Sequence, residues 1–367
     1  MLATRETEFT DRKMLYRQTK DYILDKIQRG LYGPGELIPP ERELAEQLNI
    51  SRYTVRRAIQ ELVSEGILHR VQGSGTYVTE STNTVQRNDT LGIVMPFSDA
   101  EVEMLLLNGM QKALRDTRFS MTIRGTGNSA VREWDEVHRL KEEGVSGLII
   151  MPSEEEDGGR SAVALKREGF PFVLIDRKVP GCETNCVMSD NIQGGYLSAK
   201  YLYDLGHRKI AFVRHQSDNT SSAKDRFLGY RKACQEKGLG DGILFAFDYR
   251  NGEEELQQFL LSGEYTACIA VNGYVAVDIV KACRSANLVI PDDLSLVSFD
   301  DPNILQHLEV SLTTVIQHTE MIGYRAVRLL IEEIDSQEKY GRDYIRSYTQ
   351  CYYPVRLIER ESCRRLD

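Results

Sequence analysis

The sequence lacks a long hydrophobic run. None of its apolar stretches approaches the roughly 20 residues that an α-helix needs to cross a bilayer, so we expect no contact with a membrane. The first residues, MLATRETEFTDRK, also lack the apolar segment of a secretory signal peptide. We therefore expect a soluble protein of the cytoplasm.

The sequence also lacks a disulfide framework and an enzyme motif. Its seven cysteines are an odd number, scattered from Cys182 to Cys363, which indicates free thiols in a reducing compartment. Cys182 and Cys186 have no second cysteine or histidine pair nearby, so a zinc site is not expected. His138 and His207 have no nucleophile pattern beside them and are expected to be packing residues. The stretches GTGN and GSGT lack the third glycine of a dinucleotide fingerprint; we expect a protein that is not an enzyme and has no cofactor.

Positive charge is scarce overall, because 46 basic residues stand against 55 acidic ones and the net charge is −9. Such a balance argues against nucleic-acid binding unless it is unevenly distributed. Residues 1–80 hold 12 basic and 12 acidic residues, so the whole deficit lies downstream. Within 51–79 there are four basic and two acidic residues, which indicates a local, small DNA-binding surface. We expect modest affinity per module, and hence a dimer.

The segment SRYTVRRAIQELVSEG (51–66) carries three arginines near the end where a helix dipole is positive. A cation there costs about 0.3–1 kcal/mol, so Arg52, Arg56 and Arg57 are unfavourable for stability. Helical spacing places an apolar face on the other side, formed by Val55, Ala58, Ile59 and Leu62. A polyanion would resolve the conflict, because helix N-termini bind phosphate and arginine binds phosphate or guanine edges with two donors. The pattern favours DNA over an amphipathic face that only meets solvent.

The flanking segments complete a winged helix-turn-helix. Residues 12–30 have helical apolar spacing and end in glycine, a common C-terminal cap. PPERELAEQLN begins with prolines and has acids in its first turn, and Ser51 is a suitable N-cap for the arginine helix. ILHRVQGSGTYV then predicts a β-hairpin. We assign residues 12–79 to a winged helix-turn-helix DNA-binding domain.

The pattern changes after a polar, aperiodic segment, 80–90, which we interpret as a linker. Beyond it, short apolar runs alternate with segments long enough for helices. The runs are LGIVMP, SMTIRGT, GLIIMP, FVLID, KIAFV, LFAFD, ACIAVN and SLVSFDD. They predict an α/β fold with parallel sheets covered on both faces. Because the region is long for one sheet, we assign 91–363 to a two-lobed domain for effector binding and dimerisation.

Residues 32–78 closely resemble the GntR-type DNA-binding domain. The motifs Pro-x-Glu-Arg-x-Leu-Ala, Ser-Arg-x-Thr-Val-Arg, Glu-Gly-Ile-Leu and Gly-x-Gly-Thr-x-Val occur there in order. The resemblance implies that the helix-turn-helix contacts DNA and that the wing enters the minor groove. The residues implied are Arg42, Arg52, Thr54 and Arg56, with Gln72 and Gly73 at the wing, while Ser51 and Tyr53 fit phosphate or base-edge contacts.

The remainder resembles the effector domain of the LacI/GalR regulators, which is itself similar to periplasmic sugar-binding proteins. FVLIDR, SDNIQGG, LGHRKIAFV, RFLGYRKA, IPDDLSLVSFDDP, LTTVIQ and PVRLIERES match in order. A GntR-type head on this body is the arrangement of AraR-type arabinose repressors. The resemblance implies effector contacts from Asp176, Arg226, Asn272, Asp300 and Gln317. Gly273 stands where family members usually carry an acid.

These residue types suit a carbohydrate. Adjacent sugar hydroxyls need both acceptors and donors, which a carboxylate, an arginine and amides provide. The carboxyl ends of strands are also where α/β sheets bind ligands. Other readings remain open, because Asp176 and Arg226 could be an ordinary ion pair or surface charges, and Asp300 could be a turn residue.

Together the patterns predict a homodimeric transcription regulator, a repressor of sugar-utilisation genes that a small carbohydrate between the lobes releases from operator DNA. An activator, a sensor of a non-sugar such as a purine, and an enzyme fused to a DNA-binding head are the alternatives. Dimer contacts are expected on the effector domain. Its first helix, VEMLLLNGMQKAL, offers Val102, Leu105, Leu106 and Leu114, although a buried helix would show the same pattern. The sequence leaves open how the linker couples the two domains.

Overall fold

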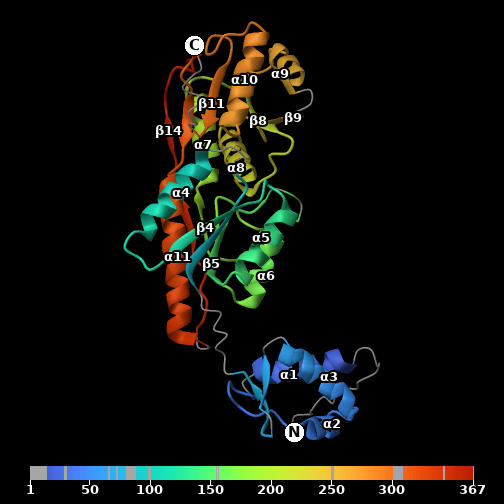
Figure 1. Cartoon of the computed structure of the whole chain (residues 1–367). Helices are drawn as coiled ribbons and strands as arrows, with labels where there is room; N and C mark the ends of the chain where they lie inside the picture. The colour runs from blue at the N-terminus through green and yellow to red at the C-terminus, as the bar shows by residue number, and fades with distance from the viewer. Residues whose placement is uncertain are drawn as a thin grey trace. The chain divides into compact units, whose positions relative to one another are not determined.

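The computed structural model of the chain contains two compact units, Met1–Gln86 and Arg87–Asp367 (Figure 1). Each has its own hydrophobic core among the described residues. The structure describes residues 15–28, 31–64, 67–71, 73–79, 88–97, 101–153, 155, 157–248, 252–300, 309–341 and 344–366.

The first unit is a helix-turn-helix followed by a hairpin. Its elements are α1 (Leu15–Gln28), α2 (Glu41–Gln47), α3 (Arg52–Ser64), β1 (Leu68–Val71) and β2 (Gly75–Val78). The two strands are antiparallel, with Leu68 opposite Val78. The predicted apolar face of α3 is confirmed, because all four of its side chains are buried, namely Val55, Ala58, Ile59 and Leu62. The predicted winged helix-turn-helix is therefore confirmed, although residues 12–14 and 29–30 lie outside the described residues.

The first lobe of the second unit is built on a parallel six-stranded sheet. Its strands, in spatial order, are β13 (Gln350–Tyr353), β7 (Cys186–Ser189), β6 (Phe172–Ile175), β5 (Val145–Ile150), β3 (Asn88–Met95) and β4 (Ser120–Gly125). Ile93 packs in the cluster that includes α4 (Glu101–Leu114) and α11 (Thr319–Tyr340). Its neighbour Val94 packs with α5 (Ala130–Glu142) and α6 (Arg160–Glu168). Since successive side chains of a strand point to opposite faces, helices cover both faces of this sheet.

The second lobe repeats the plan. Its six strands are β14 (Arg356–Ile358), β12 (Thr313–Ile316), β11 (Ser295–Phe299), β10 (Ala267–Ala270), β8 (Ile210–His215) and β9 (Ile243–Phe247). Only β14 runs antiparallel within this described sheet, against β12. The helices packed with it are α7 (Asn191–Asp204), α8 (Ser221–Glu236), α9 (Gly252–Leu261) and α10 (Gly273–Ser285). The predicted two-lobed fold with parallel sheets is confirmed.

The described chain passes between the lobes three times. It leaves β7 of the first lobe for α7 of the second, returns from β12 to α11, and crosses again from β13 to β14. The first and third crossings are joined, because the Asp190 N–H donates to the Tyr353 carbonyl at 2.8 Å. The lobes are therefore joined by three short connections, close to the carboxyl ends of β7 and β12.

Each lobe contains one pair of helices in backbone contact. In the second lobe a Cβ on Gly195 of α7 would overlap the carbonyl oxygen of Arg226 on α8, and a Cβ on Gly229 would overlap that of Ile192. In the first lobe α4 crosses α11 in the same way, because a Cβ on Gly109 of α4 would overlap the carbonyl oxygen of Glu320 on α11. Only glycine permits so close an approach, so these positions determine how the helices cross.

The helix proposed for dimer contacts is more buried than predicted. Leu106 is 1% exposed and belongs to the core beneath α11, and Val102 and Leu114 pack against the same cluster. The assignment of Leu106 to a dimer surface was therefore wrong, because α11 covers that face of α4. Met104 is the exposed apolar side chain of this helix.

Candidate effector site and DNA-binding surface

The amino end of α3 is capped as predicted. The Thr54 N–H donates to Ser51 Oγ at 3.2 Å, and the two hydroxyls are 2.7 Å apart. Arg52, Tyr53 and Arg56 are exposed on the side of the helix away from its buried face, with Tyr53 76% exposed. The cap and the core thus orient α3 so that its arginines and tyrosine face solvent.

Glu41 joins this helix to the wing. One carboxylate oxygen is 2.9 Å from Arg56 Nε and the other is 2.7 Å from a terminal nitrogen of Arg70 on β1. Arg42, beside it on α2, pairs with Glu46 at 3.0 Å. Glu41 and Arg70 were not singled out from the sequence, because they are 29 residues apart and only the fold brings them together.

The wing is described in part. Gly73 has a φ of +78°, which glycine adopts readily, and an added Cβ there would meet nothing within 4 Å. Gln72, the other predicted wing contact, lies outside the described residues. Arg57, the third arginine of the helix, lies over the ring of Tyr16 at 4.4 Å from its centroid, so it packs against α1.

Two of the predicted effector residues occupy equivalent places in the two lobes. Asp176 directly follows β6, Asp300 directly follows β11, and both have a φ of 62°. Each backbone N–H donates at 3.0 Å to the next strand, from Asp176 to Val187 and from Asp300 to Val315. This left-handed turn aims a carboxylate from the carboxyl edge of each sheet.

Arg226 on α8 is 6% exposed. It contacts several other residues of the second lobe. Its Nε donates to Asn191 Oδ1 at 2.8 Å and a terminal nitrogen donates to the Val271 carbonyl at 2.7 Å. The same nitrogen is 3.7 Å from an Asp300 carboxylate oxygen, and the guanidinium lies over the Phe299 ring. Arg226 is therefore a buried cation paired with Asp300.

Asp176 and Arg226 do not pair with each other as an isolated ion pair. Asp176 lies 3.4 Å from Arg177 Nε, and its side chain is 15% exposed. The possibility that these two residues are surface charges is excluded by their burial. Asn191 lies within the motif SDNIQGG but was not singled out as a site residue, although it accepts a hydrogen bond from Arg226.

Burial raises the pKa of Asp300 above its ordinary value. Arg226 and Gln317, whose amide donates to Asp300 Oδ1, lower that pKa, whereas the charge of Asp176 raises it. Since Asp176 belongs to the first lobe and Asp300 to the second, two carboxylates approach each other across the lobes. We call Asp176, Arg226, Asp300 and Gln317 the interlobe site.

Asn272 has a structural task in addition to the predicted one. Its Oδ1 accepts the Val275 N–H at 2.9 Å and so caps the amino end of α10, whose first residue is Gly273. This follows from the preference of helix N-termini for asparagine. The cap holds the side chain at the carboxyl end of β10, beside Val271, whose carbonyl accepts from Arg226.

Two further contacts lie at the junction of the lobes. Lys178, just after Asp176, reaches α8 of the other lobe, with its Nζ 2.7 Å from Asp225 and its N–H bonded to Ser221 Oγ at 2.9 Å. Phe97 follows β3 at the same edge of the first sheet and is 40% exposed. A large aromatic two residues after a buried strand was the sequence signal for Phe97, and it was overlooked.

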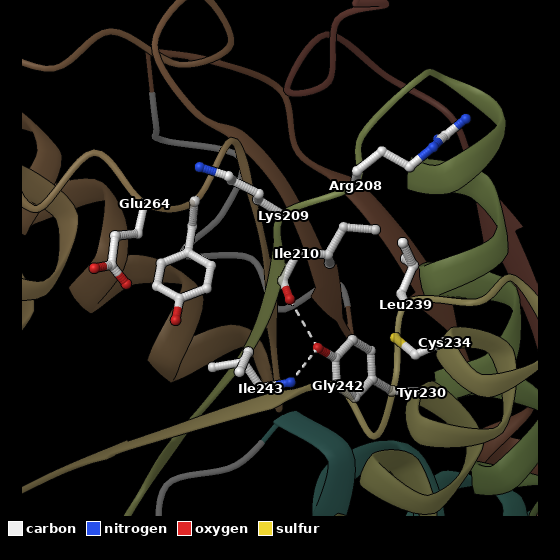
Figure 2. Close-up of a pocket in the computed structure, with 10 residues that line it drawn as sticks. Arg208, Lys209, Ile210, Tyr230, Cys234, Leu239, Gly242, Ile243 and Glu264 are labelled. Atoms are coloured by element: carbon white, nitrogen blue, oxygen red, sulfur yellow. Dashed lines mark hydrogen bonds between the residues drawn. The ribbon is translucent and has the colours of Figure 1, made fainter.

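A separate cavity of about 370 Å³ lies in the second lobe (Figure 2), at the amino ends of β8 and β9. Its floor includes Tyr230, whose hydroxyl donates to the Ile210 carbonyl and accepts the Ile243 N–H, both at 2.7 Å. Arg208 at its rim donates to the Tyr203 and His207 carbonyls. Tyr230 and Arg208 are thus each bonded to backbone groups, and the cavity lies at the end of the strands opposite to the interlobe site.

Comparison with known proteins gives two domain matches. Residues 15–78 match the model of bacterial regulatory proteins of the gntR family, and residues 199–363 match a periplasmic binding protein-like domain. The arabinose metabolism transcriptional repressor of Geobacillus stearothermophilus is 31% identical over 335 residues, covering 88% of this chain and 92% of the relative. The chain belongs to the family of the arabinose metabolism transcriptional repressors. It is a DNA-binding transcriptional regulator.

Other members and neighbours agree with this placement. The arabinose metabolism transcriptional repressor of Halalkalibacterium halodurans is 29% identical over 342 residues, covering 88% of this chain and 90% of the relative. Among solved structures, a LacI family regulator from Enterococcus faecium with bound ribose superposes with a TM-score of 0.63 at 23% identity, covering 76% of this chain and all of that one. A CelR–cellobiose complex gives a TM-score of 0.66 at 23% identity, over 85% and 90% of the two chains. These two structures establish the two-lobed fold of this repressor-family chain.

The described residues show neither a metal site nor a membrane span. They contain no group of three or more His, Cys, Asp or Glu side chains arranged for a metal ion. None of their helices is both long and apolar enough to cross a bilayer. All seven cysteines are outside disulfides.

Proposed function

We propose that this protein represses sugar-utilisation genes and leaves its operator when a small carbohydrate, such as the arabinose of its relatives' names, binds at the interlobe site. The supporting observation is the convergence of a buried arginine and two carboxylates from different lobes on one place. No sequence motif favours an enzyme, and the relatives are transcriptional regulators.

The chemistry of the interlobe site suits adjacent hydroxyls. Asp176 and Asp300 can accept hydrogen bonds from a sugar, while Arg226 can donate to it. Asn272 and Gln317 would add amide groups, and Phe97 would offer an apolar ring face. A sugar held by groups of both lobes would also weaken the repulsion by which the charge of Asp176 raises the pKa of Asp300, so binding would favour one relation of the lobes.

The DNA-binding half would act through a homodimer in the cytoplasm. Residues 12–79 of each subunit would read one half-site, α3 in the major groove and the wing in the minor groove. The proposed contacts are Arg42, Ser51, Arg52, Tyr53, Thr54, Arg56, Gln72 and Gly73. Residues 91–363 would bind the effector and form the dimer, and 80–90 would connect the two domains.

Release requires that the effector bind the two states of the protein unequally. Moving a population from 1:99 to 99:1 takes about 5.5 kcal/mol of differential affinity. A ligand that bound both lobe arrangements equally would shift nothing. The interlobe site can supply a difference because its groups belong to both lobes.

The test measures operator binding and effector binding together. A thermal-shift series with pentoses, hexoses, sugar phosphates and purines identifies the ligand, since only a bound ligand raises the melting temperature. Fluorescence anisotropy with an operator from the protein's own genome then follows DNA release as that ligand is added. Release by a pentose supports the proposal. Stabilisation by a purine alone, or tighter operator binding with the sugar, would contradict it.

A further inference from the structure

We propose that Arg118 couples the interlobe site to the DNA-binding unit by tying the first strand of the second unit to the far end of α11. The inference rests on the proposed function, because it concerns how effector binding reaches the operator. It gives the transmitting role to a residue that belongs neither to the interlobe site nor to the proposed DNA contacts.

Arg118 lies in the turn between α4 and β4 and contacts three carboxylates. Its Nε is 3.0 Å from Asp89, and a terminal nitrogen is 2.8 Å from Glu338 and 3.3 Å from Asp335. Asp89 is the second residue of β3, with which the second unit begins after the DNA-binding unit. Asp335 and Glu338 belong to the last two turns of α11. The Arg118 guanidinium therefore joins the start of β3 to the carboxyl-terminal end of α11.

The other end of α11 begins at the interlobe site. The helix starts at Thr319, two residues after Gln317, whose side chain donates to Asp300. Its 22 residues span about 33 Å. Leu330 and Ile334 are fully buried against the first-lobe sheet, and α4 crosses the helix in backbone contact. In Figure 1 α11 runs along the first lobe beside α4. A change at Gln317 would reach Arg118 through one well-packed helix.

The first residues of β3 depend on this side-chain tie. From Leu91 onward the strand is paired with both β4 and β5, but its register with β5 shifts between Asn88 and Leu91. Asp89 thus lies where the regular ladder on one side is interrupted. The ion pairs that join Asp89 to α11 through Arg118 replace part of the strand pairing with β5 that is interrupted there.

The exposure of the cluster points to a positioning role and not to stability. The four side chains are between 45% and 55% exposed, and solvent-exposed ion pairs contribute little to folding. Without Arg118, however, three carboxylates would face one another without a cation. They would repel, and the start of β3 would no longer follow α11.

Arg124 provides a matched control. It is also an arginine of the first lobe, near the carboxyl end of β4, and it pairs with two carboxylates, Glu136 at 3.3 Å and Glu143 at 3.0 Å. Neither partner belongs to β3 or α11. Arg124→Ala therefore removes a comparable ion cluster without cutting the proposed connection.

The experiment compares wild type, Arg118→Ala, Arg118→Lys and Arg124→Ala by operator anisotropy with and without arabinose, and by calorimetry with arabinose. In Arg118→Ala the ratio of operator Kd with and without the sugar should fall about fivefold, while sugar affinity and sugar-free operator affinity stay at wild-type levels. Arg118→Lys should recover part of the ratio, and Arg124→Ala should keep all of it. An unchanged ratio in Arg118→Ala, or an equal loss in Arg124→Ala, would overturn the proposal.

Hydrogen exchange supplies a readout that needs no effector. In the sugar-free protein, the peptide covering residues 88–95 should exchange faster in Arg118→Ala than in wild type or Arg124→Ala. Wild-type protection of that peptide in Arg118→Ala would overturn the tie itself. If the wild-type protein stays on its operator with arabinose and with every other sugar of the thermal-shift series, the proposed function fails on the anisotropy data, and the exchange data still decide whether Arg118 holds β3.

Discussion

Asp300 is paired with Arg226 at 3.7 Å, and both side chains are buried in the same lobe. The arginine is held from three further sides, by Asn191, the Val271 carbonyl and the Phe299 ring. A charged pair that is fixed in this way needs no reorganisation when a ligand arrives. In the proposed function, this pair would be a pre-formed acceptor and donor for a polar molecule between the lobes.

Replacing Asp300 with asparagine should weaken effector binding without affecting the operator. The variant keeps the shape of the side chain but loses a charged acceptor, and a hydrogen bond to a charged group contributes about 1.5–3 kcal/mol. We expect the calorimetric Kd for arabinose to rise by about tenfold or more. Asp241→Asn, an exposed aspartate of the same lobe that pairs with Arg231, is the control. Wild-type sugar affinity in Asp300→Asn would remove Asp300 from the site.

Removing an arginine from α3 should weaken operator binding alone. Arg52→Ala and Arg56→Ala should each cost about 1–3 kcal/mol if a base contact is lost. Lys26→Ala serves as the control, because Lys26 lies on α1 over the Tyr22 ring. Gel shifts or anisotropy measure the change, and sugar affinity should stay constant. Full retention of operator affinity in both variants would show that α3 does not read DNA.

A methyl group at Gly195 should disrupt the second lobe. Because a Cβ there would overlap the carbonyl oxygen of Arg226, α7 and α8 would have to separate. Overpacking typically costs about 1–3 kcal/mol, and we expect Gly195→Ala to reach at least the upper end in urea unfolding. Gly125→Ala is the control, since its Cβ would meet only Phe97 at an ordinary 3.4 Å. Equal stability of the two variants would refute the close crossing.

His207 should make the second lobe sensitive to mild acid. It is fully buried between Thr266 and the Arg364 carbonyl, and burial lowers its pKa below 6.5. As the pH falls through about 6.5, the unfolded chain takes up the proton first, so stability is lost by up to about 1.4 kcal/mol per pH unit. Above that pH the histidine is neutral in both the folded and the unfolded chain, so it does not make the free energy of unfolding depend on pH.

The comparison is between the pH dependence of two proteins. Urea unfolding at pH 8, 6.5 and 5.5 should give a smaller loss in His207→Gln than in wild type, although the variant is less stable at pH 8 because it disturbs two hydrogen bonds. His69→Gln, in the exposed part of β1, should follow the wild-type curve. Parallel curves for wild type and His207→Gln would contradict the assignment.

The fold was predictable where local signals were strong. GLIIMP is a continuous apolar run and forms the fully buried β5, and the two sides of α3 separate as its helical spacing required. The strands β7, β12, β13 and β14 of the second unit were missed. They have only three or four residues and lack the continuous apolar run that marks the equally short β6 and β10, so their pairing with a neighbouring strand defines them.

The candidate site was predictable only in its residue types. Asp300, Arg226 and Gln317 were expected from resemblance and lie together, but a motif does not say which of its members contact one another, and Asn191 within SDNIQGG was not singled out as the partner of Arg226. Leu106 shows the converse, since its apolar character could not distinguish an exposed dimer face from a core position. The helix that covers it, α11, begins 213 residues later in the sequence.

The glycine crossings of α4 with α11 and of α7 with α8 have a consequence for motion. Helices that touch backbone to backbone cannot slide without a clash, so each lobe should turn as a rigid body. Any opening or closing must then be absorbed by the three short connections at the lobe junction, which act as the hinge. A regulator built in this way would convert a small adjustment around a ligand between the lobes into a rotation of an entire lobe.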